Sequence, residues 1–153
     1  MTEPQRVAVY GPTGYTGRQV LAELRRREIS PVMVGRDAER LRAVEAGAGG
    51  EIRVASLEDS DALGAAFDGA AAVINCVGPF ETSAGPVVSA ALAVNAHYLD
   101  FTAEQAPVLA LLERWDEAAK DRGVAIVPAM GFYGGLGHLR CHAFDVRPEC
   151  DGR

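Results

Sequence analysis

Lysine is almost absent from this chain, which has 14 arginines and a single lysine, Lys120. Short-chain dehydrogenases depend on a Tyr-x-x-x-Lys pair, and the residue four positions before Lys120 is Asp116. That mechanism is therefore excluded. The sequence also has no G-x-S-x-G segment, so it lacks the nucleophile elbow that a Ser–His–Asp hydrolase of that kind requires.

Cysteine is scarce, and long apolar runs are missing. Cys76, Cys141 and Cys150 are odd in number and unevenly spaced, which gives no support to a disulfide framework. No apolar run approaches the length that crosses a bilayer, and the opening residues MTEPQR lack the apolar core of a signal peptide. We therefore expect a cytoplasmic protein with no membrane span.

Positive charge is also in deficit. The formal net charge is −6, and an acidic surface repels a phosphate backbone at long range, so nucleic acid is not an expected partner. His138, Cys141, His142 and Cys150 stand near one another in the sequence. Their spacing fits no recognised zinc pattern, and we expect no metal site.

The chain does have a glycine-rich turn near its start, in the segment RVAVYGPTGYTGR from Arg6 to Arg18. A short apolar run ends in Gly11, Gly14 and Gly17 follow at intervals of three, and apolar residues at helical spacing come next. A strand, a tight glycine turn and a helix in this order are typical of a dinucleotide-binding site.

Each glycine has its own part in such a site. Gly11 allows the turn, Gly14 lets the backbone approach a pyrophosphate, and Gly17 lets the helix pack closely on the strand. The helix N-terminus presents unpaired N–H groups and a partial positive charge to the phosphates, and the hydroxyls of Thr13 and Thr16 add donors. The alternative is a strand–helix turn that merely needs glycine.

Strand and helix patterns alternate through most of the chain. Apolar runs predict six strands, at residues 7–10, 31–35, 51–55, 70–77, 97–101 and 124–128, with five helices between them. The run at 70–77 is the most continuous and predicts a central strand covered on both faces, and Gly85-Pro86 is expected to open the helix that follows it.

This alternation predicts an α/β fold: a doubly wound parallel sheet between two helical layers, with strand order 3-2-1-4-5-6. The ligand is then expected over the carboxyl ends of the first and fourth strands, where the order reverses. We expect residues 1–130 to form this domain, and residues 131–153 to be an irregular tail or the remnant of a missing second domain.

The end of the second predicted strand selects the nucleotide. NAD-binding versions of this fold normally place an acid there, whereas NADP-binding versions place an arginine nearby. Here Gly35 leaves room and Arg36 can meet a 2′-phosphate with paired hydrogen bonds, with Arg40 one turn on to assist. Asp37 opposes this reading, but its carboxylate would be occupied as a helix N-cap. NADP is therefore predicted over NAD; alternatively, Arg36 is a solvated surface residue.

Four segments, in order, resemble the saccharopine dehydrogenase-like family, which includes saccharopine reductases and lipid-biosynthetic trans-acting enoyl reductases. They are VYGPTGYTGR, VGRDAERLRA, VINCVGPF and HYLDFT. The resemblance runs from about Arg6 to Phe132 and implies an N-terminal NADP-binding Rossmann domain. By position, it places Ser56 and Leu57 at the adenine and residues 75–79 on the ribose and nicotinamide side.

The predicted cofactor site combines the residues from the turn, the second strand and this resemblance. It comprises Gly11, Thr13, Gly14, Tyr15, Thr16, Gly17, Gly35, Arg36, Ser56, Leu57, Asn75, Cys76, Val77, Gly78 and Pro79. No residue is a convincing proton donor. Asp100 and Glu104 are the best spare acid–base candidates, and His97 is expected to be structural.

Members of this family are longer, and a second α/β domain supplies their substrate contacts. The leading prediction is therefore the NADP(H)-binding domain of an oxidoreductase that transfers a hydride to or from a small carbonyl, imine or enoyl substrate, with the catalytic half missing. The alternative is a non-catalytic NADP-binding sensor or interaction module. A third possibility is a bare Rossmann domain whose site binds nothing, and its exposed sheet or helix faces would then favour association into a homodimer.

Overall fold

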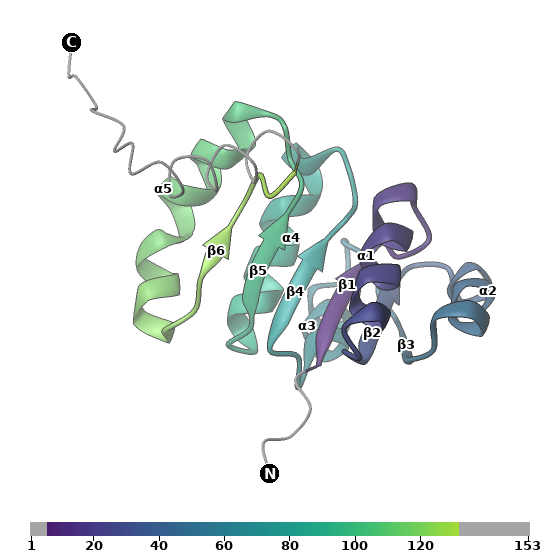
Figure 1. Ribbon diagram of the computed structural model, residues 1–153. Coiled ribbons are helices and arrows are strands. Elements are labelled where there is room, and N and C mark those ends of the chain that lie inside the picture. Colours follow the sequence, from purple (N-terminus) through teal and green to yellow (C-terminus); the bar gives the residue numbers. More distant parts are fainter. Residues whose placement is uncertain (1–5, 132–153) are drawn as a thin grey trace.

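The computed structural model describes residues 6–131, in which six strands alternate with five helices (Figure 1). The strands are β1 (Val7–Tyr10), β2 (Pro31–Gly35), β3 (Glu51–Val54), β4 (Ala72–Asn75), β5 (His97–Asp100) and β6 (Ile126–Val127). The helices are α1 (Tyr15–Arg26), α2 (Ala38–Ala48), α3 (Ser60–Phe67), α4 (Phe80–Ala93) and α5 (Gln105–Arg122). The predicted alternation is confirmed.

All six strands are parallel and follow the order β3-β2-β1-β4-β5-β6, which confirms the predicted topology. From β1 the chain moves outward to β2 and β3, and then returns to β4 on the other side of β1. At this reversal the connections leave β1 and β4 toward opposite faces of the sheet. A crevice therefore opens at the carboxyl ends of these two strands.

The alternating side chains of β1 divide the core into two layers. Ala8 and Tyr10 pack with the apolar residues of α3, α4 and α5, whereas Val9 packs with Leu21 and Leu24 of α1. Figure 1 shows the same division, with α1 in front of the sheet and α4 behind it. The buried strands at the centre thus hold α1 and α4 on opposite sides of the crevice.

Within residues 6–131, helices cover β4, β5 and β6 on one face only. Val73 and Tyr98 are buried beneath the layer of α3, α4 and α5, but Ile74, Leu99 and Val127 on the other face are only half-buried. The prediction that the run at 70–77 is covered on both faces is therefore confirmed for one face, and for the second face it stays a prediction. The one-sided cover has a topological reason, because α1 and α2 connect β1, β2 and β3 and lie over that half of the sheet.

Helix α4 begins at Phe80, so the prediction that Gly85-Pro86 opens this helix is wrong. Pro86 lies inside the helix. Because proline has no backbone N–H, the helical hydrogen bond from residue 86 to the Thr82 carbonyl is not made. Thr82 and Pro86 are both exposed residues, so this part of the helix surface faces solvent. The earlier start also shortens the turn after β4, which consists only of residues 76–79.

The predicted tail from residue 132 onward lies outside the described residues, as do His138, Cys141, His142 and Cys150. The division of the chain at residue 130 therefore stays a prediction. In the described part of the chain, no helix combines the length and the apolar character needed to span a membrane.

We expect Gly17→Ala to lower the free energy of unfolding by about 1–3 kcal/mol, because the added methyl group would collide with backbone atoms. A Cβ at this position would lie 2.3 Å from the Gly11 carbonyl oxygen and 2.7 Å from Pro12 Cα. Urea denaturation measures the effect.

The matched control is Gly64→Ala, in the interior of α3, where an added Cβ meets nothing within 4 Å. Because alanine restricts the unfolded chain more than glycine does, this variant should gain about 0.5–1 kcal/mol. Equal effects of the two substitutions would contradict a specific contact at Gly17.

Candidate functional site

The turn between β1 and α1 is packed so tightly that two of its glycines cannot be replaced without movement. Gly11 has a φ of +81°, and a Cβ there would come within 2.3 Å of Val77 Cγ2. Gly17 is buried against the Gly11 carbonyl. At Gly14, by contrast, a Cβ would meet nothing closer than 3.7 Å. Gly14 instead leaves its backbone open toward the cleft described next.

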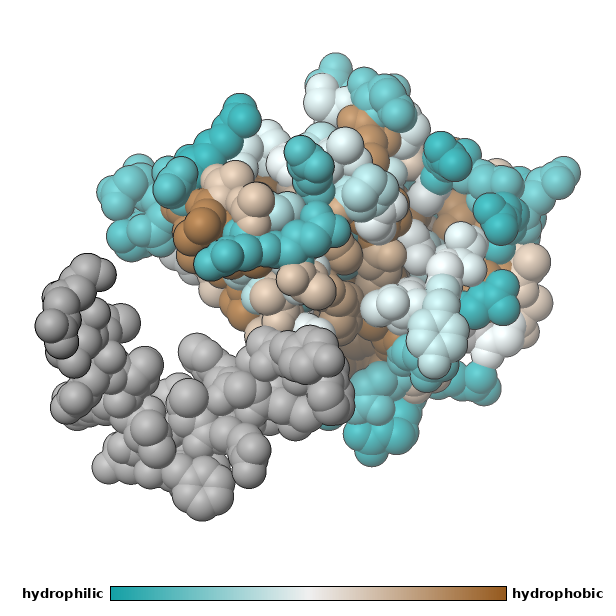
Figure 2. Space-filling view, turned by 90° about the horizontal axis from the view of Figure 1, so that it is seen from above, coloured by the Kyte–Doolittle hydropathy of each residue, from teal (hydrophilic) through white to brown (hydrophobic). Residues whose placement is uncertain are grey.

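A cleft of about 520 Å³ lies at the edge of the sheet where β1 and β4 end. Figure 2 views the molecule from above this edge and shows hydrophobic surface between rims of hydrophilic side chains. Most of the predicted cofactor residues line the cleft: Gly11, Thr13, Gly14, Gly35, Arg36, Leu57, Cys76, Val77, Gly78 and Pro79. The sheet therefore brings together residues from four separate segments of the sequence.

The other predicted residues do not line the cleft. Tyr15 is 84% exposed at the start of α1, Thr16 is half-buried, and Gly17 lies beneath the turn. Ser56 is half-buried, and Asn75 is buried behind the cleft wall. These residues support the cleft or stand beside it.

Further residues line the cleft: Tyr10, Asp37, Arg40, Leu41, Glu58 and Thr82. Of these, Arg40 is predicted to assist and Asp37 is predicted as an N-cap. Tyr10 could have been predicted to lie at the cleft, because it is the last residue before the glycine turn. Glu58 and Thr82 have no sequence signal, because they reach the cleft only through the turns after β3 and β4.

One end of the cleft is suited to an anion. The first residues of α1, from Tyr15 to Gly17, have no helical carbonyl four positions earlier to accept their N–H groups. The aligned peptides give this helix end a partial positive charge. The turn thus offers backbone donors and a favourable potential to a bound phosphate.

The rim beside β2 carries both signs of charge. Asp37 is the N-cap of α2, and its Oδ1 accepts the N–H groups of Glu39 and Arg40 at 3.0 and 3.1 Å, as predicted. A hydrogen bond from Ser56 lowers the pKa of Glu58, and the nearby Arg36 lowers it further, so Glu58 stays ionised. Arg36 therefore has an ionised carboxylate close by.

The opposite wall of the cleft is held by hydrogen bonds from behind. Asn75 Oδ1 accepts the N–H of Val77 at 3.0 Å, and the Ser83 hydroxyl donates to the Val77 carbonyl. Both side chains are buried. Because both polar groups of the Val77 backbone are fixed in this way, the segment 76–79 presents a defined surface to the cleft.

Cys76 belongs to this wall, and its thiol is expected to be unreactive. Burial raises the pKa of its thiol to about 12, because a thiolate would lose its solvation there. At neutral pH the group is therefore a protonated thiol, which is a poor nucleophile. Its position suits packing against a ligand better than covalent chemistry.

The acid–base candidates lie away from the cleft lining. Asp100 is fully buried, and its carboxylate accepts hydrogen bonds from Tyr98, Thr102 and Ala129. Glu104 is exposed next to α5. His97 Nδ1 accepts the N–H of Ala125, which agrees with a structural role. The cleft can bind and orient a ligand, while these groups stand apart from it.

Comparison with known proteins identifies a matching family. The family described as NAD(P)H-binding matches residues 11–125, which include the glycine turn and every strand up to β5 except β1. The match therefore covers most of the chain and includes most of the cleft.

Individual relatives agree with the resemblance inferred from the motifs. A saccharopine dehydrogenase-like oxidoreductase from Homo sapiens is 26% identical over 84% of this chain and 34% of its own length. A protein named as a trans-acting enoyl reductase from Mycobacterium tuberculosis is 29% identical over 82% of this chain and 32% of its own. A lipid droplet localized protein from Caenorhabditis elegans is 31% identical over 82% of this chain and 33% of its own length. The chain thus spans about a third of the length of these relatives.

Solved structures share the fold. A saccharopine dehydrogenase (L-Glu forming) from Saccharomyces cerevisiae superposes with a TM-score of 0.75 and 17% identity, over 90% of this chain and 29% of that one. The triphenylmethane reductase from Citrobacter sp., complexed with NADP(H), superposes with a TM-score of 0.59 and 18% identity. The match covers 79% of this chain and 48% of that one. The doubly wound sheet is therefore common to all three.

We expect Cys76 in the native protein to react with iodoacetamide at pH 8 at least about tenfold more slowly than a free thiol, because little thiolate forms. Peptide mass spectrometry measures the rate at this residue. The same protein unfolded in urea is the control, and there Cys76 should react at the ordinary rate. Equal rates in the native and unfolded states would show that the thiol is not shielded.

Proposed function

Because the chain belongs to the NAD(P)H-binding family, we propose that its cleft holds NADP(H) in preference to NAD(H). The observation that carries this preference is Arg36, which lines the cleft directly after β2. An arginine at the end of this strand accommodates a 2′-phosphate in other doubly wound folds. Its planar guanidinium matches a phosphate with two parallel hydrogen bonds.

The charges around Arg36 support this preference. Among the ion pairs of the described residues, none includes Arg36 or Arg40. Asp37 also lines the cleft, but its Oδ1 is engaged by the N–H groups of Glu39 and Arg40 as the N-cap of α2. Glu58, which lies near Arg36, is an opposing charge in the same lining.

The other parts of the dinucleotide have matching surfaces. In our proposal the pyrophosphate lies on the turn at Gly11, Thr13 and Gly14, next to the N-terminus of α1. The adenine lies toward Leu57, and the nicotinamide toward the wall formed by Cys76 to Pro79. Tyr15, Thr16, Gly17, Ser56 and Asn75 are proposed to act from beside or behind the cleft.

The bound nucleotide would supply a hydride at its nicotinamide, and this chain would orient the ring and exclude water from one side. We propose that the hydride passes to or from a small carbonyl, imine or enoyl substrate in the protein to which this domain belongs. The names of the saccharopine dehydrogenase-like and enoyl reductase relatives support this reaction class. The alternative is a sensor or interaction module that binds NADP(H) without turnover.

Titration of NADPH into the purified chain, followed by nicotinamide fluorescence, tests the proposal. Saturable binding that is tighter than NADH binding is expected. Oxidation of the bound NADPH by an enoyl or ketone acceptor would identify an enzyme, whereas binding without oxidation would favour the module. Absence of binding would contradict both.

Two further predictions stay as proposals. The first is a cytoplasmic location. The relatives do not share one location, because they include a lipid droplet localized protein and a probable mitochondrial protein from Arabidopsis thaliana. Association into a homodimer is the other. Its support is the half-buried sheet face at Ile74, Leu99 and Val127, and sedimentation measures it.

We expect Arg36→Ala to weaken NADPH binding by about 10- to 100-fold, because the variant would lose one or two hydrogen bonds to a charged group. NADH binding should change little, because NADH has no 2′-phosphate. Arg42→Ala is the matched control, since Arg42 lies on the same helix, α2, but outside the cleft lining. Similar losses in the two variants, or an equal loss for NADH, would refute the role of Arg36.

A further inference from the structure

A row of buried polar side chains crosses from β4 to β5 behind the cleft wall. Asn75, Tyr98 and Asp100 are each 0% exposed. The Tyr98 hydroxyl donates to Asp100 Oδ2 at 2.8 Å, and Asn75 Nδ2 donates to the Tyr98 oxygen at 3.3 Å. The row therefore connects Asp100 with the side chain that holds the N–H of Val77.

Burial makes each member of this row depend on its neighbours. A buried polar group without a partner is costly, and the described side chains include none in that state. Burial and the nearby Asp100 raise the pKa of Tyr98, so its hydroxyl keeps the proton that it donates. The hydrogen bonds thus have one consistent direction, from Asn75 through Tyr98 to Asp100.

The far end of the row holds two loops. Asp100 Oδ1 accepts the N–H groups of Thr102 and Ala129, each at 2.9 Å, and the Asp100 carbonyl accepts the N–H of Met130 at 2.8 Å. These bonds attach the loop after β6 to the end of β5. Asp100 is therefore the common anchor of the loops that follow β5 and β6.

The backbone at Ala129 indicates that this attachment overcomes local strain. Its φ is +61°, in the left-handed region that costs a residue with a side chain about 1 kcal/mol or more. Such a conformation persists only where surrounding contacts impose it. The bonds from Ala129 and Met130 to Asp100 are contacts of this kind.

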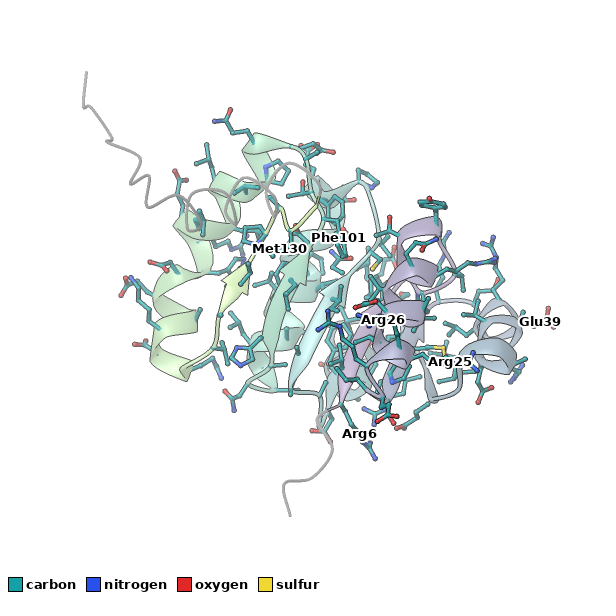
Figure 3. The ribbon with its side chains drawn as sticks, viewed as in Figure 1. Arg6, Arg25, Arg26, Glu39, Phe101 and Met130 are labelled. Atoms are coloured by element: carbon teal, nitrogen blue, oxygen red, sulfur yellow. The ribbon has the colours of Figure 1, made fainter. Side chains whose placement is uncertain are left out.

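We propose that Asp100 is a positioning residue, which fixes the loop 128–131 relative to the nicotinamide-side wall 76–79 through Tyr98 and Asn75. This inference rests on the proposed dinucleotide site. Both segments lie at the edge where the parallel strands end, so a substrate that approaches the nicotinamide there would meet both. Phe101, half-buried, and Met130, 42% exposed, make the rim of these loops apolar (Figure 3).

The test is Tyr98→Phe, which keeps the ring in the core and removes only the linking hydroxyl. Residue-resolved amide hydrogen exchange without nucleotide is measured first. Exchange at Ala129 and at Val77 should both rise by about tenfold, the loss of roughly one hydrogen bond to a charged group. Ser89→Ala is the control, because it removes a hydroxyl from the exposed side of α4 and should change neither rate.

A second variant keeps the proposal testable if Tyr98→Phe does not fold. Ser83→Ala breaks the bonds to the Val77 carbonyl and to Asn75 Nδ2, at the opposite end of the row from Ala129. Faster exchange at Ala129 in this variant supports the connection. Unchanged exchange at Ala129 in the variants that fold overturns it, whether or not NADPH binds.

Addition of NADPH separates positioning from mere structural support. In the native protein, saturating NADPH should slow exchange at Ala129, although this residue is not part of the cleft lining. In Tyr98→Phe, NADPH should still slow exchange at Val77 but no longer at Ala129. NADPH binding without any response at Ala129 in the native protein overturns the inference. Failure of NADPH to bind defeats the proposed function instead, and the nucleotide-free exchange then decides the inference.

Discussion

The close approach of α1 to β1 is the constraint on which the cleft depends. Gly17 lies against the Gly11 carbonyl with no room for a methyl group, and Gly11 in turn lies against Val77. The first contact places the N-terminus of α1 directly beyond the end of β1. The second brings the segment after β4 against the same turn. One set of glycine contacts therefore sets the distance between the N-terminus of α1 and the opposite wall of the cleft.

The strand order follows from the sequence because right-handed crossovers and a single reversal leave few ways to arrange six parallel strands. The ends of the elements depend on contacts that periodicity does not contain. β4 ends at Asn75, although the apolar run continues to Val77, because Asn75 Oδ1 takes the N–H of Val77. α4 begins at Phe80, where the N–H of Ser83 bonds to the Pro79 carbonyl, and the helix continues through Pro86.

The candidate site divides in the same way. Gly11, Thr13 and Gly14 could be predicted because a local motif places them, and Arg36 because a strand ends beside it. Tyr15 and its neighbours are equally close in sequence, but each residue of a helix turns its side chain by about 100° from the last, and Tyr15 faces solvent. Glu58 and Thr82 reach the cleft from distant turns, which only the assembled sheet can reveal.

The charge pattern at the end of β2 also depends on geometry more than on residue type. An acid directly after this strand would normally bind the ribose hydroxyls and favour NAD. Asp37 stands one residue later, and the N–H groups of Glu39 and Arg40 hold its carboxylate at the start of α2. Its carboxylate therefore caps the N-terminus of α2, where backbone N–H groups and the helix dipole stabilise a negative charge. Capping thus engages one carboxylate oxygen of Asp37, while Arg36, directly after the strand, lines the cleft with Glu58 nearby.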